Sequence, residues 1–155
     1  MQKLLIVGFG DIGSRAAARL SHCYRIYGLA RNAAGAQRIR AQGAMPVPGD
    51  LDQASTLRRL GGIADVVLHF APPQRQGQHD QRTRNLLAAL ARGKSLPQRL
   101  VYISTTGVYG DCQGGEVDEL HRICPTTARA VRRADAEAAL RQWGQRHGCR
   151  VSILR

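Results

Sequence analysis

The stretch Leu4-Leu5-Ile6-Val7-Gly8-Phe9-Gly10-Asp11-Ile12-Gly13 decides the fold class. Its first four residues are a continuous apolar run, which is typical of a strand buried on both faces of a parallel sheet. Glycines end that run at once, and the alanine-rich residues 12–20 have helical propensity. A strand, a glycine turn and a helix in this order predict the first part of a βαβ unit.

Outward from this unit, the rest of the chain alternates between short apolar runs and longer polar-apolar stretches. Strands are expected at residues 24–29, 44–47, 64–70, 99–104 and 151–154, and helices at residues 33–41, 53–60, 79–92 and 127–146. Residues 107–125 are expected to form a loop. Strict alternation with right-handed crossovers predicts an α/β fold in which a doubly wound parallel sheet lies in a three-layer α/β/α arrangement.

Composition indicates an ordinary globular chain. The chain has 155 residues, of which 43% are hydrophobic and 22% charged, so one domain is expected. The apolar runs are too short for a signal peptide or membrane span, so we expect a cytoplasmic protein with no membrane partner. Four scattered cysteines without a C-x-x-C pair predict neither a metal site nor a disulfide framework.

The net charge of +12 is carried almost entirely by arginine, because Lys3 and Lys94 are the only lysines. One interpretation is an anionic partner, either a phosphorylated cofactor or nucleic acid. The other is that the arginines lie on solvated helix faces, since no arginine run exceeds two residues. The chain contains no nucleic-acid recognition motif, so no nucleic-acid partner is expected.

The glycine turn predicts a dinucleotide site. Gly8 permits a tight turn, Gly10 lets the backbone approach a pyrophosphate, and Gly13 lets the helix pack closely on the strand. The helix N-terminus then supplies N–H groups and a positive dipole. The turn residues expected at the cofactor are therefore Gly8, Phe9, Gly10, Asp11, Ile12 and Gly13. The alternative is an unoccupied turn in an α/β protein that binds no nucleotide.

The end of the second strand bears on the choice of cofactor. Gly28-Leu29-Ala30-Arg31-Asn32 contains no acid to bind the ribose 2′-hydroxyl of NAD, and Arg31 stands there instead. A guanidinium suits a 2′-phosphate, so the cofactor expected is NADP, with NAD left open. Alternatively, Arg31 is one more solvent-exposed arginine.

Five segments resemble the short-chain dehydrogenase/reductase superfamily, in its extended and atypical branch of NAD-dependent epimerases and dehydratases. They are the glycine turn, Gly49-Asp50-Leu51, Val67-Leu68-His69-Phe70-Ala71-Pro72, Tyr102-Ile103-Ser104-Thr105-Thr106-Gly107-Val108-Tyr109-Gly110-Asp111, and Pro125 leading into a helix with Glu137. The resemblance implies an NAD(P)-binding Rossmann fold over residues 1–155. It also implies cofactor contacts by Asp50, Leu51, Phe70, Ala71, Pro72, Ser104 and Arg133.

The resemblance places the substrate beside residues 104–109. Thr105 falls where the family's serine or threonine hydrogen-bonds the substrate oxygen, and Thr106 and Tyr109 are expected to line the substrate pocket. The alternative for Thr105 is a strand-end residue that only caps the following turn. His69 is assigned no catalytic role, because a histidine at a strand end is more often a packed residue.

The helix after Pro125 departs from the family pattern. The family has a tyrosine and, four residues on, a lysine that lowers its pKa, whereas these positions hold Arg129 and Arg133. Arginine stays protonated and cannot act as the general acid. Arg133 can still hold the nicotinamide ribose. Tyr109 could supply a phenol from the neighbouring loop, although a tyrosine at such a position more often lines the substrate pocket.

The resemblance therefore implies an NAD(P)-binding oxidoreductase, or a nucleotide-sugar epimerase- or dehydratase-like protein, which transfers hydride at the nicotinamide. The alternative is a non-catalytic NADP-binding redox sensor or regulatory protein. We expect a small-molecule substrate of the sugar-nucleotide class and a homodimer, although nothing in the sequence names either. The family builds most of its substrate pocket after the strand at 151–154, so that C-terminal part is expected to be absent from this chain.

Overall fold

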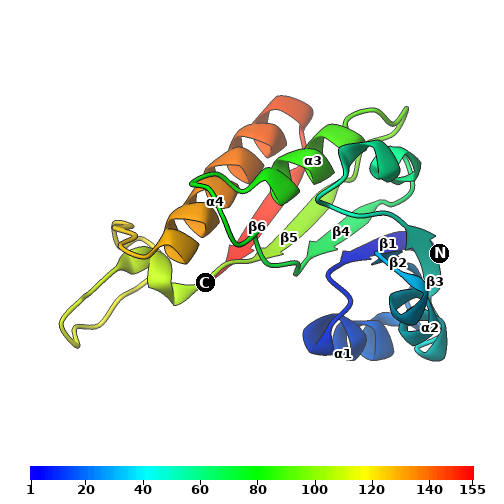
Figure 1. The fold of residues 1–155 in the computed structure, drawn as a ribbon, viewed down its shortest axis with the longest axis horizontal. Helices are drawn as coiled ribbons and strands as arrows, with labels where there is room; N and C mark the ends of the chain where they lie inside the picture. Colours follow the sequence, from blue (N-terminus) through cyan, green and yellow to red (C-terminus); the bar gives the residue numbers. More distant parts are fainter.

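Six parallel strands form one sheet in the computed structural model, which describes residues 1–155 (Figure 1). They are β1 (Gln2–Val7), β2 (Tyr24–Ala30), β3 (Met45–Pro48), β4 (Val66–His69), β5 (Arg99–Ile103) and β6 (Arg150–Leu154). Their order across the sheet is β3-β2-β1-β4-β5-β6, and every neighbouring pair is parallel. This order confirms the doubly wound sheet, because the chain builds outward from β1 first in one direction and then in the other.

Helices cover both faces of the sheet. The α-helices are α1 (Asp11–Leu20), α2 (Ala33–Ala41), α3 (Gln81–Leu90) and α4 (Ala128–His147), and the 3₁₀ helices are η1 (Ala54–Leu60) and η2 (Thr106–Tyr109). One buried cluster joins the sheet to α1 and α2, and the other joins it to η1, α3 and α4. Figure 1 shows α1 and α2 on one side and α3 and α4 on the other. The three-layer α/β/α prediction is thus confirmed.

Strand β1 explains why its apolar run does not alternate with polar residues. Leu4 and Ile6 belong to the cluster with α1 and α2, whereas Leu5 and Val7 belong to the cluster on the opposite face. All four side chains are essentially buried. A central parallel strand that is covered on both faces needs apolar residues at every position.

Three elements differ from the sequence prediction. The 3₁₀ helix η2 lies at the start of the loop expected at 107–125. The strand expected at 64–70 ends at His69, because the N–H groups of Phe70 and Ala71 both donate to the carbonyl of Val7. Two donors on one carbonyl turn the chain out of the ladder. The helix expected at 53–60 is the 3₁₀ helix η1, whose Leu57 and Leu60 are fully buried. Packing of these two leucines holds a tighter winding than propensity predicts.

Polar side chains begin three of the four α-helices. Asn32, Asp80 and Thr127 accept hydrogen bonds from backbone N–H groups in the first turns of α2, α3 and α4. Each such cap satisfies a donor that the helix itself cannot. None of the helices is both long enough and apolar enough to cross a bilayer.

Candidate functional site

A cavity of about 700 Å³ lies along the carboxyl ends of the strands. It is centred where the chain switches direction between β1 and β4, the position at which open α/β sheets bind ligands. Every residue that the sequence predicts at the cofactor lines this one cavity: Gly8, Phe9, Gly10, Asp11, Ile12, Gly13, Arg31, Asp50, Leu51, Phe70, Ala71, Pro72, Ser104 and Arg133. Six separate segments of the chain therefore converge on a single site.

The glycine turn has the geometry that its sequence predicts. Gly8 has φ of 97°, and a Cβ at this position would lie 2.4 Å from the backbone nitrogen of Ala71. A Cβ on Gly13 would lie 2.6 Å from the carbonyl oxygen of Gly8. A Cβ on Gly10 would meet no atom within 4 Å, so it would project into open space beside the cavity that this residue lines. Gly8 and Gly13 are needed for packing, whereas the backbone at Gly10 is left open to a ligand.

Helix α1 begins at this turn without a side-chain cap. Gly10 is its N-cap residue and has no side chain to accept from the first backbone N–H groups. Those N–H groups and the positive end of the helix dipole therefore face the cavity, which makes the turn suited to an anion such as a pyrophosphate. The salt bridge between Asp11 and Arg15 lies on the exposed side of the same helix, at 3.1 Å.

The β2 and β3 side of the cavity has an excess of positive charge. Arg31 and Arg38 line it and form no ion pair, whereas Arg82 is neutralised by Asp52 at 2.6 Å. The hydrogen bond from Arg82 lowers the pKa of Asp52 and keeps that carboxylate ionised. A second cavity of about 680 Å³ adjoins this end and shares Arg31 with the first. Two guanidinium groups without a salt bridge thus lie at the β2 and β3 end of the cavity.

The end of β4 is held by a buried polar chain. The Nε2 atom of His69 is 2.8 Å from Oγ1 of Thr83, which in turn donates to Asp80 at 2.8 Å. Complete burial, and then the positive charge of Arg133, lowers the pKa of His69 to about 3. His69 is therefore neutral at ordinary pH and fixes the strand end that leads into Phe70, Ala71 and Pro72.

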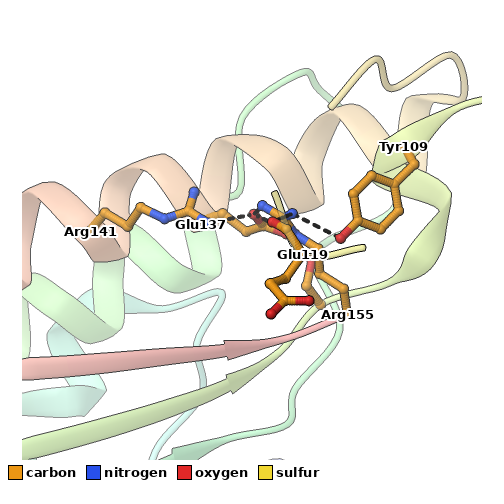
Figure 2. A network of polar contacts seen from close by, with 6 residues as sticks. Tyr109, Glu119, Glu137, Arg141 and Arg155 are labelled. Atoms are coloured by element: carbon orange, nitrogen blue, oxygen red, sulfur yellow. Dashed lines mark hydrogen bonds and ion pairs between the residues drawn. The ribbon is translucent and has the colours of Figure 1, made fainter. Parts of the chain in front are cut away.

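At the end of β5, Ser104 belongs to a buried ionic network that the sequence did not predict. Its hydroxyl donates to Oε1 of Glu137 at 2.5 Å, and Glu137 is completely buried. Figure 2 shows this carboxylate between Arg141 and Arg155, at 3.3 and 2.7 Å, and Arg155 in turn donates to the Tyr109 hydroxyl at 3.1 Å. The network joins β5, α4 and the end of β6.

The three residues expected at the substrate lie outside the large cavity. The Thr105 hydroxyl accepts from the backbone N–H of Gly107 at 3.2 Å and so caps η2. Thr106 and Tyr109 line a neighbouring cavity of about 540 Å³, together with Arg155. The capping geometry is the alternative considered for Thr105, and the substrate roles of all three residues remain predictions.

Two of the three arginines in the N-terminal part of helix α4, Arg129 and Arg133, line the large cavity. Arg129 is exposed and without a polar partner, whereas Arg133 is 5% exposed and donates to the Ile103 carbonyl and the Tyr102 hydroxyl, at 2.6 and 3.0 Å. Arg132 points elsewhere and donates to the carbonyl of Gly77. Burial raises the pKa of Tyr102 to about 12, so this phenol stays protonated and is a poor acid.

Some residues of the site were not predicted from the sequence. Arg38 and Arg82 line the cavity although no motif contains them. Glu137 does not line the cavity, and it entered the prediction only as a residue of the helix after Pro125. A signal for Glu137 was present, because it is one turn beyond Arg133 and one turn before Arg141. An acid flanked by arginines at this spacing indicates a paired carboxylate.

Comparison with known proteins places the chain in a family. The family model described as "NAD dependent epimerase/dehydratase family" matches residues 4–155, and the chain therefore belongs to that family. No curated protein matches the sequence. The family defines a dinucleotide-binding Rossmann domain, in agreement with the sheet order described above.

Solved structures share this fold. A double mutant of dTDP-glucose 4,6-dehydratase from Streptomyces venezuelae, with NAD bound, is 26% identical with a TM-score of 0.77, and the alignment covers 97% of this chain and 54% of that one. A UDP-glucuronic acid 4-epimerase from Bacillus cereus, in complex with UDP-glucuronic acid and NAD, is 24% identical with a TM-score of 0.79 and coverages of 99% and 55%. A UDP-galactose 4-epimerase is 20% identical with a TM-score of 0.82 and coverages of 99% and 55%. The chain spans about half the length of the structures it matches.

Proposed function

We propose that this protein binds a nicotinamide dinucleotide along the carboxyl edge of its sheet and prefers NADP to NAD. One observation carries the proposal: every residue expected at the cofactor from separate sequence segments lines the same cavity. The open space above Gly10 and the uncapped start of α1 suit a pyrophosphate. Solved relatives that contain NAD support the same cofactor class.

The preference for NADP rests on the charges at the end of β2. Arg31 and Arg38 have no carboxylate partner, and no acid follows β2 to accept from a ribose hydroxyl. A 2′-phosphate would accept bidentate, charge-assisted hydrogen bonds from these guanidinium groups. NAD would leave both unpaired.

Titration with NADPH and NADH by isothermal calorimetry at fixed ionic strength tests both parts. We expect tighter binding of NADPH, and an Arg31→Ala variant that weakens NADPH about tenfold or more while changing NADH little, since hydrogen bonds to charged groups contribute about 1.5–3 kcal/mol. Arg40→Ala, on the exposed part of α2 outside the cavity, is the matched control. Equal affinities for the two cofactors would contradict the NADP preference, and binding of neither would contradict the site itself.

For activity, we propose hydride transfer between the nicotinamide and a small-molecule substrate of the sugar-nucleotide class. When bound, the nicotinamide supplies the hydride donor or acceptor, and the protein supplies position. Ser104 has its hydroxyl hydrogen committed to Glu137, so toward a ligand it is an acceptor. Thr105 accepts from Gly107 through its oxygen and keeps its own hydrogen to donate to a substrate oxygen.

The second candidate is a non-catalytic NADP-binding redox sensor. It is favoured by the guanidinium groups of Arg129 and Arg133 at the positions where the family has tyrosine and lysine, and by the raised pKa of Tyr102. Incubation with cofactor and UDP-glucuronic acid or dTDP-glucose, followed by nicotinamide absorbance and sugar NMR, separates the two. Turnover supports the enzyme, whereas unequal affinities for NADP⁺ and NADPH without turnover support the sensor.

A further inference from the structure

The β5 and α4 end of the large cavity has positive charge that no carboxylate of the chain pairs with. Arg129 and Arg133 are one helical turn apart on the same face of α4, and both line the cavity. Neither forms an ion pair with any carboxylate of the chain. This is a different arrangement from Arg82, which lines the same cavity and is held by Asp52.

Arg133 is an unusual buried charge. Its side chain is 5% exposed, Nη1 donates to two neutral oxygens, and its Nε has no partner at all. A buried guanidinium without a direct ion pair is costly, because burial penalises the charged form. The carboxylate of Asp80 interacts with it electrostatically but forms no salt bridge with it. A ligand in the cavity is the partner that this structure leaves open to it.

The positive charge of Arg129 interacts unfavourably with the helix dipole. It lies in the first turn of α4, where the partial charge of the helix is positive and where acids rather than arginines are stabilising. No acidic residue is present in that turn to offset it. The guanidinium, the helix terminus and the buried Arg133 therefore combine into one anion-attracting surface.

The phosphates of a dinucleotide are accounted for elsewhere in the cavity. The glycine turn after β1 suits the pyrophosphate, and Arg31 after β2 suits a 2′-phosphate. Arg133 contacts the end of β5, which is three strand spacings, or about 14 Å, from β2. The arginine pair of α4 is thus left for an anion that is not part of the cofactor.

We propose that Arg129 and Arg133 bind an anionic group of the substrate, a carboxylate or a phosphate, beside Ser104. This inference rests on the proposed cofactor site. It adds that the substrate bound beside the cofactor is negatively charged and is held by bidentate hydrogen bonds from the two guanidinium groups. Where a tyrosine would exchange a proton, the arginine pair fixes the orientation of the substrate and stabilises negative charge.

Calorimetric titration of the protein saturated with NADP⁺ tests the inference, with malonate, inorganic phosphate and neutral malonamide as probes at constant ionic strength. We expect malonate or phosphate to bind the cofactor complex and malonamide not to bind. Arg129→Gln should weaken that binding at least tenfold while leaving NADP⁺ affinity within about twofold. Arg146→Gln, exposed in the last turn of the same helix, is the matched control and should change neither. Preference between malonate and phosphate identifies the anion.

Three outcomes overturn the inference. They are no anion binding to the NADP⁺ complex, anion binding that NADP⁺ displaces, and anion binding that Arg129→Gln leaves unchanged. Failure of the cofactor site is distinguished on the same samples, because the NADP⁺ titration comes first. If the protein binds malonate through Arg129 but binds no NADP⁺, the anion site stands and the proposed function is wrong. If it binds neither malonate nor NADP⁺, the anion site and the proposed function are both wrong.

Discussion

At the scale of single residues, we expect the glycines of the turn to have different roles: Gly13 is required for folding, whereas Gly10 is required for ligand binding. The Cβ of Gly13→Ala would lie 2.6 Å from a backbone oxygen, whereas the Cβ of Gly10→Ala would project into open space. We expect Gly13→Ala to lower the free energy of unfolding by about 1–3 kcal/mol through overpacking. Gly10→Ala should cost only about 1 kcal/mol as an N-cap change, yet weaken cofactor binding about tenfold or more.

Urea denaturation and cofactor titration of the two variants provide the measurement. The wild-type protein is the reference for both quantities. A Gly10→Ala variant that binds cofactor as tightly as the wild type would show that no ligand approaches the backbone at this residue.

At the scale of elements, Glu137 joins three of them. Its carboxylate accepts from Ser104 at the end of β5 and pairs with Arg155 at the end of β6, while its own backbone is in α4. Glu137→Gln would leave the Arg155 guanidinium, which is only 14% exposed, without its counter-ion. Breaking a buried pair costs about 3–5 kcal/mol, so we expect a loss of that order in the free energy of unfolding.

Arg141→Gln is the matched comparison for this prediction. Arg141 pairs with the same carboxylate from the 48% exposed side, and exposed pairs contribute about 1 kcal/mol or less. We expect the smaller loss for Arg141→Gln in urea denaturation. Equal decreases in the free energy of unfolding for the two variants would contradict the prediction that the buried Glu137–Arg155 pair contributes most of the stability.

At the scale of the whole molecule, stability should depend on pH through His69. Burial and Arg133 lower its pKa to about 3 in the folded protein, from an ordinary value of 6.5. Between these values the unfolded chain binds a proton that the folded chain does not, so the free energy of unfolding falls as the pH decreases from 6.5 toward 3. The slope due to one such group reaches about 1.4 kcal/mol per pH unit.

Comparison with His69→Gln isolates this contribution. Glutamine retains an N–H donor for Thr83 and does not titrate, whereas the neighbouring Asp80 and Tyr102 are present in both proteins. Denaturation curves between pH 6.5 and 4.5 should show the steeper decline in the wild type. Parallel curves would mean that His69 is protonated in the folded protein.

How much of the site was predictable depends on the range of each interaction. The glycine turn, the acid-free end of β2 and the segments after β4 and β5 are local patterns, and the carboxyl ends of parallel strands meet at one edge of the sheet. The fold class alone therefore brings Arg31, Phe70 and Ser104 to one cavity. The roles of Thr105 and Arg133 depend on side-chain rotamers and partners, which no local pattern specifies.

The amino-acid sequence by itself determined the order of elements and the doubly wound sheet, because backbone propensity and apolar periodicity act over a few residues. It also indicated, through the glycine turn and the family resemblance, many of the residues that line the large cavity. Tertiary structure alone decided that Glu137 is buried between β5 and β6, that Thr105 caps η2, and that Arg129 and Arg133 face the cavity while Arg132 does not. These outcomes depend on contacts between residues far apart in the chain. Such contacts form only when helix α4 packs on the sheet.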